Sequence, residues 1–92
     1  MTDSRAPTAK YDADEHARRG DEIYERQIRA TVEPQRDGDF IAIDVESGDY
    51  EVSADERDAT ERLIARRPDA QIWLRRVGSP YAYRIGFAPP PR

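Results

Sequence analysis

The run from Phe40 to Phe87 holds most of the apolar residues and turn signals of this 92-residue chain. Two strand-turn-strand patterns within it flank one helical pattern, so the run predicts a hairpin, a helix and a second hairpin. This order is typical of an α+β fold, and we expect a four-stranded antiparallel sheet with its helices on one face. The four expected strands cover residues 40–45, 50–52, 70–77 and 81–87.

The helix between the two hairpins has a start and a stop signal in the sequence. Ser53 and Glu56 are spaced as a capping box, in which the serine hydroxyl accepts the Glu56 amide and the carboxylate reaches back to the Ser53 amide. Pro68 ends the helix near residue 66 or 67, because proline has no amide donor. The expected buried stripe consists of Ala59, Leu63 and Ile64.

Another helix is predicted over residues 12–32, where apolar residues recur at three- and four-residue spacing. Gly20 costs this helix about 1 kcal/mol relative to alanine, so its secure part is expected to begin near Gly20 or Asp21. We predict one domain over residues 12–87, between a disordered tail of residues 1–11 and a Pro-rich tail of residues 88–92.

The composition excludes several classes of protein. The chain has no cysteine, which rules out disulfides, thiolate metal sites and cysteine nucleophiles. No apolar run approaches the ~20 residues that span a bilayer, and the N-terminus lacks the apolar stretch of a signal peptide. We therefore expect a cytoplasmic protein with no membrane partner.

The net charge of −4 is unevenly distributed along the chain. Residues 1–56 contain 16 acids and 7 basic residues, whereas residues 57–92 contain 3 acids and 8 arginines. Such asymmetry suggests a charged partner. The favoured interpretation is instead internal pairing, with the acidic first hairpin beside the basic second one.

Four carboxylates surround the first predicted hairpin, and oxygen ligands of this kind suit calcium or magnesium. They belong to Asp44, Glu46, Asp49 and Glu51. Their spacing does not fit an EF-hand loop, so the favoured interpretation is a solvated acidic turn with no metal or cofactor. Asp44 interrupts an apolar strand, and we expect it to face solvent or to pair with an arginine of the neighbouring strand.

Arginines alternate with aromatic residues on the second predicted hairpin, a composition found both at protein interfaces and on single-stranded nucleic-acid platforms. We predict outward-facing, partner-binding side chains here, with structural pairing within the core as the alternative. The residues are Trp73, Arg75, Arg76, Tyr81, Tyr83 and Arg84. Nucleic acid is the less favoured partner, because the sequence pI is near 5.0 and no RRM, KH or dsRBD motif is present.

No catalytic set is apparent in the sequence. His16 is the only histidine, and we expect it at the surface with no serine or cysteine nucleophile nearby. Gly-rich phosphate loops are absent. The sequence therefore predicts a protein that is not an enzyme.

Six short blocks between Gly20 and Gly86 carry a resemblance to a known family. They read GDEIY (20–24), FIAID (40–44), GDYE (48–51), RRPDA (66–70), RVG (76–78) and YRIG (83–86). With these blocks the chain resembles a family of small uncharacterised bacterial proteins, often encoded next to retropepsin-like aspartic proteases. The resemblance implies a partner or regulator in a two-gene unit, of an antitoxin-like kind, and it implies no activity.

These patterns together favour a small non-enzymatic protein-interaction module. We expect it to bind a protein partner or a second copy of itself through the sheet or the edge strand 81–87, because strand edges offer unpaired amides and carbonyls. A neighbouring aspartic-protease-like protein is one such partner. The alternatives are an antitoxin-like module that binds nucleic acid through the basic hairpin, and a carboxylate-dependent metal site or hydrolase at the first hairpin.

Overall fold

The computed structural model describes residues 9–78, and they form an α+β fold with one long helix, a three-stranded sheet and a further helix. The long helix consists of α1 (Ala13–Ile23), a π-helical segment η1 (Tyr24–Ile28) and a last turn α2 (Arg29–Val32). The remaining elements are β1 (Phe40–Asp44), β2 (Tyr50–Ser53), α3 (Glu56–Arg66) and β3 (Ile72–Arg76).

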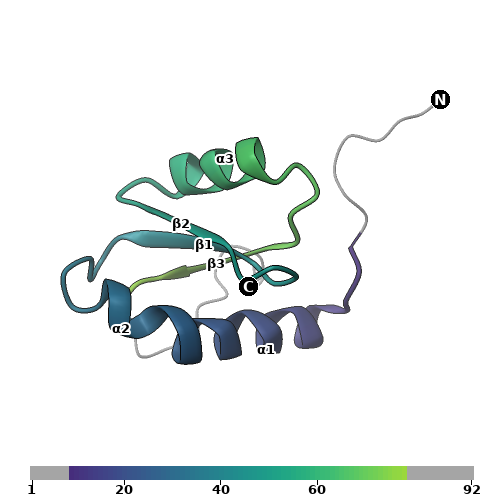
Figure 1. The fold of residues 1–92 in the computed structure, drawn as a ribbon, viewed down its shortest axis with the longest axis horizontal. Helices are drawn as coiled ribbons and strands as arrows, with labels where there is room; N and C mark the ends of the chain where they lie inside the picture. The colour runs from purple at the N-terminus through teal and green to yellow at the C-terminus, as the bar shows by residue number, and fades with distance from the viewer. Residues whose placement is uncertain (1–8, 79–92) are drawn as a thin grey trace, which may run out of the picture.

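The sheet is antiparallel throughout, in the order β2-β1-β3 (Figure 1). The central strand β1 places Ile41 opposite Val52 of β2 and opposite Arg75 of β3. Three of the four predicted strands are confirmed in position. The predicted fourth strand, residues 81–87, and the Pro-rich tail lie outside the described residues.

The two helices cover opposite faces of the sheet, with α1 on one side and α3 on the other (Figure 1). Ile41 and Ile43 pack with Tyr24 of the long helix, whereas Ala42 packs with Leu63 of α3. The expectation that both helices lie on one face is therefore wrong. The sequence signal was present, since a central strand covered on both faces reads as a continuous apolar run such as Phe-Ile-Ala-Ile.

Gly20 is where the long helix comes closest to the sheet. A Cβ atom built on Gly20 would lie 2.3 Å from the Cε3 atom of the Trp73 ring. The helix continues through this glycine and begins at Asp12, whose carboxylate accepts a hydrogen bond from the Glu15 amide at 2.8 Å. A long helix lies over the predicted range of residues 12–32, but its middle is the π-helical segment η1. The predicted later start near Gly20 is wrong, because this glycine lets the helix pack closely against Trp73.

The cap of α3 also differs from the prediction. Asp55 is the N-cap residue, and its Oδ2 atom accepts from the Asp58 amide at 3.2 Å. Ser53 is still part of β2, and its hydroxyl oxygen accepts from the Asp55 amide instead. The predicted capping box of Ser53 and Glu56 is wrong, because the chain makes one more turn between the strand and the helix.

Replacing Gly20 with alanine should destabilise the protein by about 1–3 kcal/mol, because overpacking against a buried ring outweighs the gain in helix propensity. Urea denaturation followed by far-UV circular dichroism measures this change. In a Trp73→Ala background the same Gly20→Ala substitution should be neutral or stabilising. Equal costs in both backgrounds would contradict the assignment of Trp73 as the obstacle.

Candidate functional site

Two of the predicted contact residues are buried under the long helix. Trp73 is only 2 % exposed, and the Arg75 side chain is 3 % exposed. The Arg75 guanidinium lies 3.8 Å from the centroid of the Tyr24 ring, and its Nη1 atom is 3.2 Å from Oδ1 of Asp21. The expectation that Trp73 and Arg75 face outward is wrong, because they alternate on the face of β3 that α1 covers.

Arg76 is the predicted contact residue that the structure leaves at the surface. Its guanidinium lies 4.4 Å from the centroid of the Phe40 ring, on the neighbouring strand. The other three predicted contact residues, Tyr81, Tyr83 and Arg84, lie outside the described residues. The six residues therefore do not form one exposed patch over the described part of β3.

Tyr24 links the long helix to the end of β3, a role that the sequence did not indicate. Its hydroxyl donates to Oε2 of Glu33 at 2.6 Å and accepts from the amide of Gly78 at 3.3 Å. Burial and the hydrogen bond to Glu33 raise the pKa of Tyr24 to about 12. The same bond lowers the pKa of Glu33. The neutral phenol and the ionised carboxylate are thus held together beside the Arg75 guanidinium.

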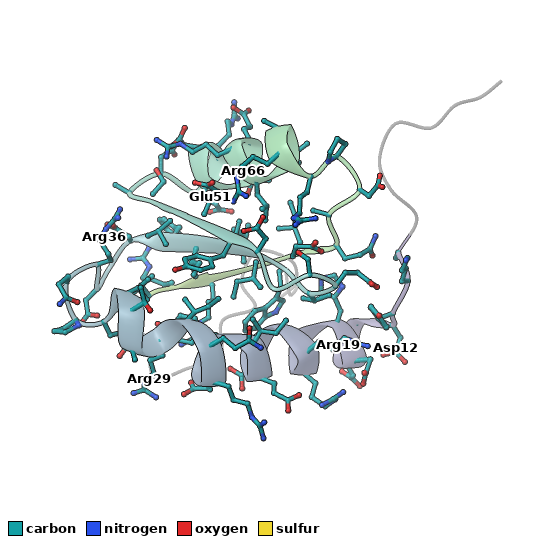
Figure 2. All side chains as sticks on the ribbon, in the orientation of Figure 1. Asp12, Arg19, Arg29, Arg36, Glu51 and Arg66 are labelled. Atoms are coloured by element: carbon teal, nitrogen blue, oxygen red, sulfur yellow. The ribbon has the colours of Figure 1, made fainter. Side chains whose placement is uncertain are left out.

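Two of the four carboxylates of the first hairpin, those of Asp49 and Glu51, pair with Arg66 of α3 and with Arg67, the residue after it. Nε of Arg66 is 2.8 Å from Oε2 of Glu51, and Nε of Arg67 is 2.9 Å from Oδ2 of Asp49. Figure 2 shows Arg66 and Glu51 pointing toward one another across the gap between α3 and β2. Within the described residues, these two acids are balanced by Arg66 of α3 and by Arg67. The second hairpin, which internal pairing would place beside them, lies partly outside that range.

Asp44 serves the structure of the hairpin turn. It is 3 % exposed, and its carboxylate accepts from the Gln71 amide, the Ser47 hydroxyl and the Glu46 amide. Burial opposes ionisation, but these hydrogen bonds outweigh it and lower the pKa of Asp44. Within residues 9–78 the carboxylate is buried and pairs with no arginine, so neither expected placement is found there. Within residues 9–78, no three acidic or histidine side chains cluster as a metal site would require.

His16 lies against the outer edge of the sheet. Its Nε2 atom is 2.8 Å from the carbonyl oxygen of Ile72, and the side chain is half-buried. The expectation of a plain surface histidine is wrong for this reason. The Ile72 carbonyl that His16 contacts faces away from β1, so this contact lies on the outer edge of β3.

The outer edge of β3 is open over most of its length. The Gln71 carbonyl accepts from Val45 and the Val77 amide donates to Asp39, so the odd-numbered residues of β3 point their backbone groups at β1. The backbone groups of Ile72, Leu74 and Arg76 therefore point away from the sheet. Within the described part of the chain, no hydrogen bond reaches the Leu74 amide, the Leu74 carbonyl or the Arg76 amide.

The opposite edge of the sheet is closed at its hairpin end. On β2, the outward amide of Tyr50 donates to Oδ1 of Asp49 at 3.1 Å. The outward carbonyl of Tyr50 accepts from Nη2 of Arg66 at 3.0 Å. Side chains thus occupy backbone groups that a partner strand would need on β2.

A groove runs beside the open edge, between β3 and the first half of α3. Its volume is about 610 Å³, and Leu74 supplies its only strand residue. Leu74 and Ile72 pack against the core of this face but stay half-exposed. The open edge and this groove together form the candidate site, which we call the β3 edge site. Its α3 residues are Asp55, Glu56, Arg57, Thr60 and Glu61.

A larger hollow of about 880 Å³ lies where the end of α3 meets the first hairpin. Arg66, Arg67 and Asp44 line it, but each of them is already bonded within the fold. Among the described residues, no helix is long and apolar enough to cross a membrane.

Acid should weaken the fold through Asp49. Hydrogen bonds from Arg66 and Arg67 lower the pKa of Asp49 from 3.8 to about 2. A carboxylate with a depressed pKa contributes stability above pH 3.8 that is lost as the pH falls toward 2. Thermal denaturation from pH 6 to pH 2 should show a smaller loss of stability in Asp49→Asn than in the wild type. Asp69→Asn, at an exposed acid, is the control, and identical acid profiles for all three proteins would refute the prediction.

Tyr24→Phe should cost about 1–3 kcal/mol, because Glu33 and the Gly78 amide each lose a partly buried hydrogen-bond partner. Tyr50→Phe removes a hydroxyl that makes no hydrogen bond within residues 9–78, and should cost much less. Chemical denaturation of both variants gives the comparison. A similar cost for the two substitutions would show that the Tyr24 hydroxyl is not a link between helix and strand.

Comparison of the chain with protein-family models, with curated proteins and with solved structures finds no match to any of them.

Proposed function

We propose that the protein is a small non-enzymatic protein-interaction module that binds a protein partner, or a second copy of itself, at the β3 edge site. The observation that carries this proposal is the difference between the two edges of the sheet. Side chains close the hairpin end of β2, whereas on β3 every second residue, Ile72, Leu74 and Arg76, points its backbone groups away from the described sheet. An added strand would bond to the unpaired amides and carbonyl of Leu74 and Arg76.

The chemistry of the described residues gives little support to catalysis. His16 directs its Nε2 atom at a backbone carbonyl, and Asp49 and Glu51 hold arginines. Asp44 is surrounded by hydrogen-bond donors from its own turn and from Gln71. These groups stabilise the fold, and a reacting molecule would find none of them free for acid-base chemistry.

A protein strand suits the site better than a nucleic acid. Phosphate contacts need exposed cations, but Arg75 is buried, which leaves Arg76 as the exposed cation on the described part of β3. The α3 residues of the groove include three acids and one arginine, which would repel a phosphate backbone. The partner or regulator role in a two-gene unit, implied by the family resemblance, is compatible with such a site.

We further propose that the sheet of the complete protein has a fourth strand, residues 81–87, on the β3 side. The tyrosine-rich alternation of that segment is the support for it, together with its position just after β3. A partner strand that bonds to Leu74 and Arg76 then replaces this fourth strand at the β3 edge site.

The test is association of an edge variant compared with a matched control. Arg76→Pro removes an amide that points outward from β3, and Val52→Pro removes an outward amide on β2, so neither substitution breaks a bond to β1. Molar mass by light scattering over a dilution series measures self-association. Co-purification with the product of the neighbouring gene measures binding to a second protein.

We expect association to be lost in Arg76→Pro and kept in Val52→Pro, while circular dichroism of both variants stays native. Association that survives Arg76→Pro would contradict binding at the β3 edge site. Raising the salt concentration should weaken a strand interface little, whereas a steep loss of affinity with salt would indicate a nucleic-acid binder.

A further inference from the structure

The groove of the β3 edge site is only partly filled by the described residues. Helix α3 packs chiefly over β1 and β2, and its contact with β3 is slight. Leu74 is therefore left half-exposed at the floor, beside a strand edge with unpaired backbone groups. A hollow with an apolar floor and one open strand edge fits an extended peptide with apolar side chains.

The charge of the groove favours a peptide that carries positive charge. The rim carries Asp55, Glu56 and Glu61 against Arg57, which leaves it acidic. Residues 79–92 of the chain itself contain two arginines and no acid. Their apolar side chains alternate, as Tyr81, Tyr83, Ile85 and Phe87. The alternation of the segment is that of a strand, and the net positive charge of residues 79–92 suits an acidic rim, with Arg84 on the face opposite these apolar side chains.

The position of the segment in the chain matches as well. β3 ends at Arg76, and Gly78 follows with a φ of +83°, a backbone conformation that favours glycine in turns. Strand residues rise by about 3.3 Å each, so seven residues reach along the whole of the five-residue β3. A tether of a few residues gives the segment a high effective concentration at this edge.

We propose that residues 81–87 of the same chain occupy the β3 edge site in the free monomer, and that a partner strand binds by displacing them. The displacement step depends on the function proposed above, whereas the occupancy does not. The protein's own residues 81–87 would then cover the site. The apparent affinity for a partner would depend on the fraction of molecules in which this segment is detached.

Amide hydrogen exchange on the full-length chain tests the occupancy. It is measured at a concentration where light scattering shows a monomer, on the wild type and on Ile85→Pro. Ile85→Pro disrupts pairing of the segment without touching a described residue, and Ala88→Pro, placed just beyond the segment, is the control. We expect the Leu74 and Arg76 amides to exchange at least about tenfold faster in Ile85→Pro than in the wild type or the control.

Three results would overturn the proposal. Fast exchange of both amides in the wild-type monomer would show that the edge is bare. Slow exchange that persists unchanged in Ile85→Pro would show that another part of the chain covers it. Protection that appears only at concentrations where dimers form would also overturn it, because a second copy would then supply the strand.

Displacement is tested separately on the same variants. Ile85→Pro should bind the partner, or a second copy, more tightly than the wild type, because no resident strand competes. Unchanged or weaker binding, together with the expected exchange result, would refute displacement while leaving occupancy intact. Failure of the function proposed above gives a different result: association with the partner would then be the same in Arg76→Pro as in the wild type.

Discussion

The packing of Trp73 against Gly20 is the contact on which the rest of the structure depends. It brings the long helix so close to the sheet that a single methyl group at position 20 would collide with the ring. That approach also places Tyr24 over the Arg75 guanidinium and within reach of Gly78. This one close contact therefore sets the position of the long helix, the burial of Arg75 and the hydrogen bond between Tyr24 and Gly78 at the end of β3.

This arrangement decides which part of the protein is left for binding. One face of the sheet is covered by the long helix and the other by α3, so the faces themselves are largely occupied. Side chains from the first hairpin and from Arg66 close the hairpin end of β2. Among the described residues the β3 edge site remains, and it is where we propose that a partner strand binds. Specificity would come from the groove beside α3.

Local sequence signals predicted much of the fold. Turn residues and alternation located β1, β2, α3 and β3, and the apolar spacing located the long helix. The exposure of individual side chains was harder to predict than the elements. Trp73 and Arg75 are residue types that are common at interfaces, but they lie on the face of β3 that α1 covers. Gly20 reads as a weak point in the sequence, since its packing role depends on a ring 53 positions away. The position of Asp44 was not predicted, because two of its three partners are backbone amides, which carry no sequence signature.

The most direct measurement is the emission of Trp73, the only tryptophan of the chain, recorded with an iodide quencher across a dilution series. The structure predicts blue-shifted, poorly quenched emission at every concentration, including that of the monomer, because the ring is buried by the long helix. Red-shifted and readily quenched emission in the monomer, moving to the blue on association, would contradict the account. Trp73 would then be an interface residue, and the face under α1 would be the binding surface.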